Sequence, residues 1–276
     1  MAPRSGLWIL AALAAVLSPA SASAQTITRG PYLQWVTESS IHVVWDQDKA
    51  SAAEVRFGLT KSYTGKVASK SKGTHHEVKV TGLTPNSTYY YAVYQGATKL
   101  SADLTLPSGV KSGTPFRFVV LGDTRTDKVA HANVVTAISL EQKVRYYINT
   151  GDLVSSGEIQ KEWDEFFKIE KLLISHVPLY PVIGNHDEKS GKAPIYKKHF
   201  VLPNNSPDPE EYYSFDYGNV HFIALDGHIN VDLWYECALK LKFYPPAEAS
   251  TTNRPPGSPR TSRLRPPTAR STTSSC

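Results

Sequence analysis

Cysteine is almost absent from this chain of 276 residues. The only two cysteines, Cys237 and Cys276, both lie near the C-terminal end. An oxidising compartment would allow a disulfide between them, but the loop that it closed has too little apolar content for a bridge to hold together. We therefore interpret both cysteines as incidental, and no disulfide framework is expected.

Apolar runs long enough to cross a membrane are also lacking. The N-terminal apolar stretch from Leu7 to Leu17 is shorter than the ~18 residues that a spanning helix needs. An arginine precedes it and the small residues Ala22-Ser23-Ala24 follow it, which is the order of a secretory signal peptide. We predict a signal peptide over residues 1–24, cleaved after Ala24. The mature protein would be secreted or periplasmic and free of the membrane.

Most of the chain lacks an excess of either positive or negative charge. The formal net charge is +5, but from Cys237 to Cys276 seven Lys and Arg face a single acid. That segment carries +6, so the rest carries −1. The basic isoelectric point is thus a property of the C-terminal segment, and we expect no nucleic-acid binding by the folded part.

Residues 237–276 are rich in Pro, Ser, Thr and Arg and show no period, so they cannot bury enough apolar surface to fold. One interpretation is a natural disordered basic tail, whose arginines would bind polyanions nonspecifically. The other, which we favour, is a lost reading frame or a truncated gene. An α/β domain that stops near Asp232 would leave a sheet edge exposed and one face uncovered.

Short strand-like segments fill residues 26–107. IHVVW, AEVRFG, HHEVKV and TYYYAVYQG are separated by turn residues at intervals of about ten, with no helical period. This spacing predicts a small antiparallel β-sandwich. A linker of turn-forming residues, LPSGVKSGTP, follows from Leu106 to Pro115.

The pattern then changes to strands that alternate with helices, which predicts a layered α/β domain over residues 115–232. The expected strands are FRFVVLGD, KVRYYINTGD and LYPVIGNHD, followed by two strands around a turn at Tyr217-Gly218-Asn219. In the first expected helix, within 127–142, the apolar face would hold Val129, Val134, Ala137 and Ile138. A capping box of Ser155 and Glu158 would start the second, whose apolar stripe comprises Trp163, Phe166, Phe167, Ile169, Leu172 and Leu173. The predicted fold class is a two-domain α+β protein, a sandwich followed by an incomplete α/β domain.

Polar residues follow three of these strands directly, as Gly122-Asp123, Gly151-Asp152 and the tetrapeptide from Gly184 to Asp187. The carboxyl ends of parallel strands are where α/β sheets form their sites, and we expect each glycine to allow a sharp turn. Carboxylate, amide and imidazole donors suit Mn, Fe or Zn. Two such cations can clamp a phosphoryl group and generate hydroxide at neutral pH.

This ordered set of motifs, GD, GD and GNHD about 30 residues apart, resembles the calcineurin-like metallophosphoesterase superfamily. With a fibronectin-III-like sandwich in front, it is similar to the purple acid phosphatase branch, over roughly Thr28 to Asp232. The resemblance implies hydrolysis of phosphate esters by two metal ions, Fe, Mn or Zn. Asp123 would bind the first metal, Asp152 would bridge both, and Asn185 would bind the second. His186 would assist departure of the leaving oxygen, and Asp187 would be an orienting residue.

Departures from the family pattern reduce the expected activity. Arg125 stands where many members have a metal-binding histidine, and it could hold a phosphate oxygen instead. Ser155 replaces the tyrosine that gives purple acid phosphatases their colour, so the charge-transfer band should be absent. The later histidine motifs have no counterpart, and Gly227-His228-Ile229-Asn230 is assigned to a loop. Six other histidines are assigned to the surface or to packing: His75, His76, His131, His176, His199 and His221.

We therefore expect a chain that is catalytically poor or inert. The alternative is a noncatalytic secreted module that binds a partner through the sandwich. The sequence does not indicate an oligomeric state.

Overall fold

A computed structural model of the chain describes residues 25–188, 193–206 and 210–227. The predictions for the signal peptide, for the loop residues His228 to Asn230 and for the segment 237–276 lie outside these residues.

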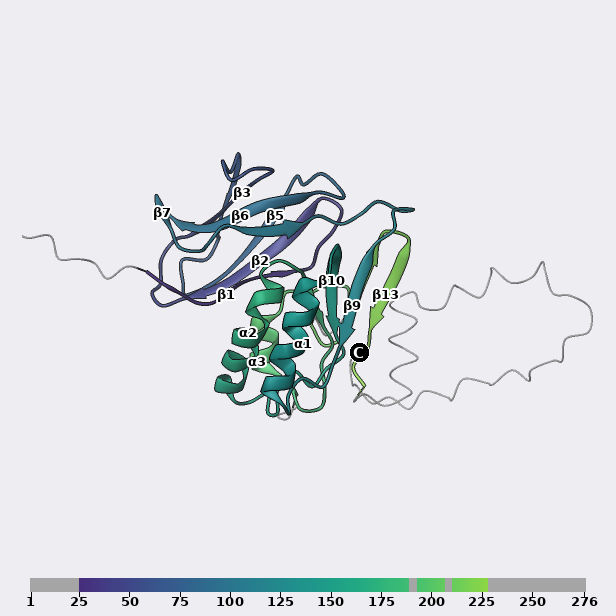
Figure 1. Ribbon diagram of the computed structural model, residues 1–276. Coiled ribbons are helices and arrows are strands. Elements are labelled where there is room, and N and C mark those ends of the chain that lie inside the picture. The colour runs from purple at the N-terminus through teal and green to yellow at the C-terminus, as the bar shows by residue number, and fades with distance from the viewer. Residues whose placement is uncertain (1–24, 189–192, 207–209, 228–276) are drawn as a thin grey trace, which may run out of the picture.

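The first half is the predicted sandwich (Figure 1). One layer holds β5, β2 and β1, and the other holds β4, β3, β6 and β7, with β8 paired to β6. All of these neighbours are antiparallel. Val43, Trp45, Val55 and Tyr91 are fully buried between the layers, as the period of two requires. The strands are β1 (Ile27–Gln34), β2 (Ser40–Gln47), β3 (Glu54–Gly58), β4 (Gly65–Ala68), β5 (His75–Thr81), β6 (Thr88–Gln95), β7 (Thr98–Lys99) and β8 (Leu104–Pro107).

The second half is the predicted α/β part. Its parallel strands lie in the order β11, β10, β9, and the predicted pair around Gly218 forms a separate two-stranded antiparallel sheet. The elements are β9 (Arg117–Leu121), α1 (Lys128–Leu140), β10 (Val144–Asn149), α2 (Gln160–Ile174), β11 (Leu179–Pro181), α3 (Pro194–His199), β12 (Tyr213–Tyr217) and β13 (Val220–Ala224). No helix among the described residues has the length and apolar character to cross a membrane.

One sheet continues through both halves of the molecule, which the sequence did not predict. Gln34 of β1 pairs in parallel with Leu179 of β11, so six strands run in the order β5-β2-β1-β11-β10-β9. The pairing satisfies the edge of β11 that β10 leaves free, and an unpaired edge would otherwise expose its backbone groups. The sandwich therefore supports the parallel sheet directly.

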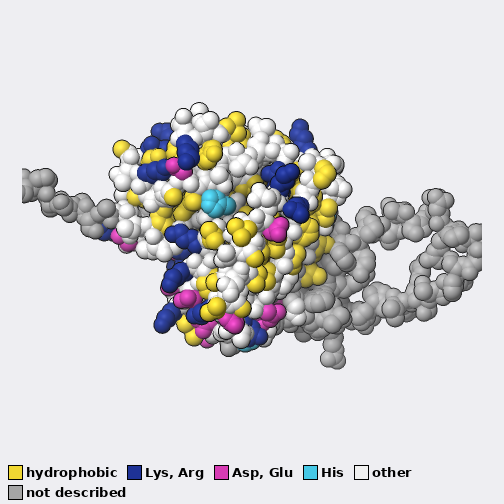
Figure 2. Space-filling model, in the orientation of Figure 1, with side chains coloured by type: hydrophobic (Ala, Val, Ile, Leu, Met, Phe, Trp, Pro, Cys, Tyr) yellow, Lys and Arg dark blue, Asp and Glu magenta, His cyan; other side chains and the backbone are white. Residues whose placement is uncertain are grey.

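Helix α1 lies in a different rotation from the one predicted. Its buried residues are His131, Val135 and Ile138, whereas Val129 is 71% exposed and Val134 40% exposed. Ala137 is also exposed. The helix turns His131 inward because its imidazole bonds to the buried Glu170 of α2 at 2.7 Å. Figure 2 shows apolar side chains on the surface over α1 and β9.

The start of α2 also differs from the prediction. Its N-cap is Ile159, with no side-chain cap bond, so the Ser155–Glu158 capping box is wrong. Glu162 is the acidic residue that bonds to the backbone before the helix. Its carboxylate accepts from the backbone amides of Ser155 at 2.7 Å and Ser156 at 2.9 Å. The predicted apolar stripe is confirmed except at Leu172, which is 55% exposed.

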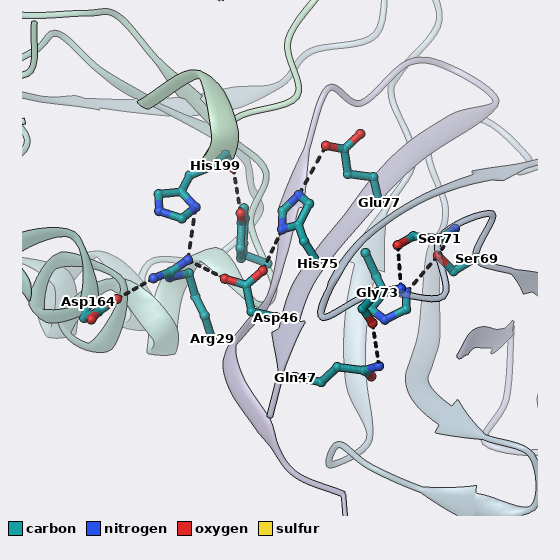
Figure 3. Close-up of polar contacts among 12 residues, drawn as sticks. Arg29, Asp46, Gln47, Ser69, Ser71, Gly73, His75, Glu77, Asp164 and His199 are labelled. Carbon is teal, nitrogen blue, oxygen red and sulfur yellow. Dashed lines mark hydrogen bonds and ion pairs between the residues drawn. The ribbon is translucent and has the colours of Figure 1, made fainter. Parts of the chain in front are cut away.

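A polar cluster joins the sandwich to the helices (Figure 3). Arg29 of β1 forms ion pairs with Asp46 of β2 and Asp164 of α2. Its guanidinium also lies 3.0 Å from Nδ1 of His199, at the end of α3. Because arginine only donates, His199 accepts on Nδ1 and is neutral. Asp46 accepts in turn from His75 at 2.6 Å, and this bond raises the pKa of His75 to about 9.

Low pH should lower the stability of the fold, because His199 is held neutral in this cluster. Burial, with the charges of Arg29 and Lys198, lowers its pKa to about 3, against the smaller opposing effect of Asp46. The unfolded chain takes up a proton near pH 6.5 and the folded chain does not, so stability is full above pH 6.5 and falls as the pH drops toward 3. At pH 4 the loss is on the order of 3 kcal/mol. Urea unfolding at pH 7 and pH 4 measures it.

The matched variant is His199→Asn, whose amide oxygen can accept from Arg29 without titrating. It should show a smaller difference between the two pH values than the parent. His42, whose pKa burial lowers to about 4, gives a component that both proteins share. Equal pH dependence in the two proteins would show that His199 is not the titrating group.

Candidate metal centre

The three predicted ligand loops meet at one edge of the parallel sheet. Each follows the carboxyl end of β9, β10 or β11, and these strands are neighbours in the sheet. Backbone bonds connect the loops: the Asp123 amide donates to the Gly151 carbonyl at 3.0 Å, and the Val182 amide donates to the Asn149 carbonyl at 2.7 Å. The common edge predicted from the motifs is therefore present in the fold.

The left-handed backbone conformation at these turns is adopted by the aspartates, and not by all of the glycines before them. Asp123 and Asp152 have φ angles of 55° and 56°, the left-handed region that only Asn, Asp and Gly adopt at low cost. Gly184 is needed for space, since a Cβ there would lie 2.3 Å from the Asp152 carboxylate. The expectation that every glycine supplies a sharp turn is thus wrong for Gly184. Glycine is required there because the Asp152 loop packs against its backbone and leaves no room for a side chain.

Asp152 lies at the centre of the site and is 8% exposed. One carboxylate oxygen accepts from the His186 amide at 3.1 Å. The other accepts from Nε of Arg125 at 2.9 Å. Arg125 is partly exposed, so it balances the charge of a nearly buried carboxylate from the solvent side.

His186 has a fixed ring orientation. Its Nδ1 lies 2.8 Å from the Ser155 carbonyl oxygen, which only accepts, so Nδ1 carries a proton. The backbone of His186 is held as well, since its carbonyl accepts from the Gly157 amide at 2.8 Å. Nε2 is then the ring atom available to exchange a proton with another molecule.

Asp187 points into the protein. Its two oxygens accept from the backbone amides of Val154 at 3.1 Å and Gly184 at 2.9 Å, and the residue is 1% exposed. Burial raises the pKa of this carboxyl to about 7. Both oxygens are used in tying two loops together, which suits the orienting role expected of it.

Sequence reasoning missed three features of the site. The Arg125–Asp152 ion pair and the Glu162 carboxylate under Ser155 depend on long-range folding. The third is a buried bond between His131 and Glu170, two residues on the facing sides of α1 and α2. A cavity of about 100 Å³ beside Arg125 is lined by His131, Ser155 and Glu162, among others.

The donor set fits a cation of the oxygen-preferring kind. Asp123 and Asn185 are exposed, and each Asp152 oxygen accepts one hydrogen bond and keeps a further lone pair. Within the described residues no three His, Cys, Asp or Glu side chains cluster closely enough to hold a metal ion. The candidate ligands for one cation are thus two carboxylates and an amide oxygen, those of Asp123, Asp152 and Asn185, and a second cation would need further ligands.

Comparison with known proteins agrees with this fold. Residues 28–106 match the purple acid phosphatase N-terminal domain. Purple acid phosphatase 15 of Arabidopsis thaliana is 29% identical over 193 residues, covering 59% of this chain and 36% of the relative. Probable purple acid phosphatase 20 of the same plant is 26% identical over 212 residues, covering 72% and 48%. The chain thus spans less than half the length of these relatives.

Solved structures show the same architecture. The purple acid phosphatase PPD1 from yellow lupin (Lupinus luteus) seeds aligns with a TM-score of 0.60 at 18% identity, over 76% of this chain and 49% of that one. The structure of PhoD aligns with a TM-score of 0.54 at 13% identity, over 73% and 52%. At these identities the likeness concerns the fold alone. Residues 116–256, just over half the chain, match the calcineurin-like phosphoesterase family, and the chain belongs to that family.

Proposed function

We propose that the chain is a metal-dependent phosphoric ester hydrolase of the acid phosphatase or phosphodiesterase type, with Asp123, Asp152 and Asn185 as cation ligands. The observation that carries the proposal is the meeting of three ligand-bearing loops at one sheet edge. Membership of the calcineurin-like phosphoesterase family supports the reaction class. Bound Fe, Mn or Zn would supply a nucleophilic hydroxide and neutralise charge on the phosphoryl group.

Arg125 and His186 would act on the substrate in this proposal. Only Nε of Arg125 bonds to Asp152, so its Nη groups can donate to phosphate oxygens in the fork geometry that suits them. His186, oriented by the Ser155 carbonyl, would protonate or stabilise the leaving oxygen through Nε2. Asp152 holds both groups in place, since it accepts from the side chain of one and the backbone of the other.

We further propose that hydrolysis by this chain is weak and that it takes place outside the cytoplasm. Cations of this type take about four to six ligands, and three candidate side chains are present in the part of the chain that the structure describes. The location rests on the signal-peptide pattern of residues 1–24.

Calorimetric titration with Mn²⁺, Fe²⁺ or Zn²⁺, followed by assay on a chromogenic phosphate ester, tests the proposal. We expect stoichiometric binding of at least one cation per chain, with little turnover. A protein that binds none of these cations would overturn the proposal and favour the noncatalytic binding module.

The Arg125→Ala variant separates the two parts of the site. Inorganic phosphate should bind the metal-loaded variant roughly tenfold more weakly, because a charge-assisted bond is lost. Cation affinity should hold or rise, since a positive charge beside Asp152 has been removed. Unchanged phosphate binding would contradict the role given to Arg125.

A further inference from the structure

A buried chain of hydrogen bonds leads from the helices to the candidate site. His131 of α1 bonds through Nε2 to Oε1 of Glu170 on α2 at 2.7 Å. The Tyr147 hydroxyl donates to the same oxygen at 3.1 Å, and the Asn149 amide donates to the Tyr147 hydroxyl at 2.9 Å. Tyr147, Asn149 and Glu170 are 0% exposed and His131 is 5% exposed. Four polar side chains from three elements are thus buried together.

The direction of these bonds fixes the orientation of Asn149. The Tyr147 proton goes to a carboxylate, so its hydroxyl can only accept from Asn149. The NH₂ group of Asn149 therefore faces Tyr147, and its Oδ1 faces the other way. There Oδ1 accepts from the Gly151 amide at 3.0 Å, a group that can only donate. Both ends of the amide are determined, and the side chain has one orientation.

Gly151 connects Asn149 to both aspartates. It directly precedes Asp152, and its carbonyl accepts from the Asp123 amide at 3.0 Å. The φ angle of Gly151 is 108°, and Asp123 and Asp152 are both in the left-handed region. Backbones in such conformations persist where surrounding contacts hold them. Asn149 supplies such a contact to the amide of Gly151, the residue whose carbonyl bonds to the Asp123 turn.

We propose that Asn149 is a positioning residue for the cation ligands Asp123 and Asp152, with the Tyr147–Glu170–His131 chain holding its amide. The proposal rests on the proposed function for the identity of the ligand. It assigns a role to His131 and Glu170 beyond packing. Burying four polar side chains is costly, the more so because Oε2 of Glu170 is buried without a hydrogen-bond partner in the described part of the chain. Their connection to the ligand turns gives that burial a function.

The test compares Asn149→Leu with the parent protein by Mn²⁺ calorimetry and by hydrogen exchange of the segments 121–125 and 149–153. We expect a loss of Mn²⁺ affinity of about 10- to 100-fold, the usual effect of removing a residue that orients a ligand. Exchange should quicken in both segments, since the Gly151 amide loses its acceptor. Tyr147→Phe, which leaves the Asn149 amide without its acceptor, should give a smaller change of the same kind.

Gln34→Leu is the matched control, because the buried Gln34 of β1 also accepts from a backbone amide, that of Val201 after α3, at 2.7 Å. It should lower the melting temperature without changing Mn²⁺ affinity or exchange in the two segments. If Asn149→Leu fails to fold, Tyr147→Phe decides the question. Parent-like affinity and exchange in the folded variant would overturn the positioning role alone. A parent that binds none of Mn²⁺, Fe²⁺ and Zn²⁺ overturns the proposed function, and unchanged exchange in Asn149→Leu then overturns this inference separately.

Discussion

Replacing Asp152 by Asn should reduce Mn²⁺ affinity by at least about 100-fold, since even residues that only orient metal ligands cost 10- to 100-fold when changed. The variant keeps the shape of the side chain but removes its charge. Asn also tolerates the φ of 56° at this position, and its oxygen can still accept from the His186 amide. The loss should therefore come from the missing carboxylate and not from a distorted turn. Calorimetric titration of the two proteins measures it.

Two further measurements make this result specific. The variant should unfold within about 1 kcal/mol of the parent, because the partly exposed Arg125 can turn to solvent once its partner is neutral. Asp216→Asn provides the control, since its side chain on β12 is 82% exposed, and its Mn²⁺ affinity should match the parent. Equal affinities in all three proteins would remove Asp152 from the ligand set. Robust phosphatase turnover that disappears in Asp152→Asn would instead show that hydrolysis by this chain is stronger than we propose.

Local pattern was enough to predict the strands and the order of the ligand loops. The alternating residues of β5 read directly as inward and outward positions, and the Gly-Asp pairs mark the ends of β9 and β10. Such signals depend on neighbours in sequence. The parallel pairing of Gln34 with Leu179 joins segments that are far apart in sequence, and no local period carries that information.

The rotation of α1 about its axis and the hydrogen bonds around the site depend on which polar side chains the fold buries. The apolar residues of α1 favour a face with Val129 and Val134, yet the helix buries His131 because Glu170 provides a partner. Likewise, Glu162 and not Glu158 reaches the amides before α2. Whether a polar residue is buried depends on the partner that the fold brings to it. For the same reason, local sequence pattern assigns His131 only to the surface or to packing.

A methyl group at residue 157 should unfold much of the site. A Cβ added to Gly157 would lie 1.7 Å from the Asp187 carbonyl oxygen and 2.4 Å from its carbon, so the backbone of one loop must move. The Gly157 amide bonds to the His186 carbonyl at 2.8 Å, and its carbonyl accepts from the Trp163 indole at 2.9 Å. Neither the loop of Gly157 nor the loop of Asp187 can move away without breaking one of these hydrogen bonds. For Gly157→Ala we expect a loss of about 4 kcal/mol in unfolding free energy.

At this chain length such a loss corresponds to a melting temperature roughly 10 °C lower, measured by calorimetry. Gly73→Ala is the control, since the nearest atom to its added Cβ is the hydroxyl of Ser71, a movable side chain, at 3.3 Å. It should melt within a few degrees of the parent. The His186 loop should also shift in Gly157→Ala, so any Mn²⁺ binding should weaken together with stability. A Gly157→Ala protein that melts like the parent would mean that the 155–157 and 184–187 loops do not touch in solution, and the site built on their contact would have to be abandoned.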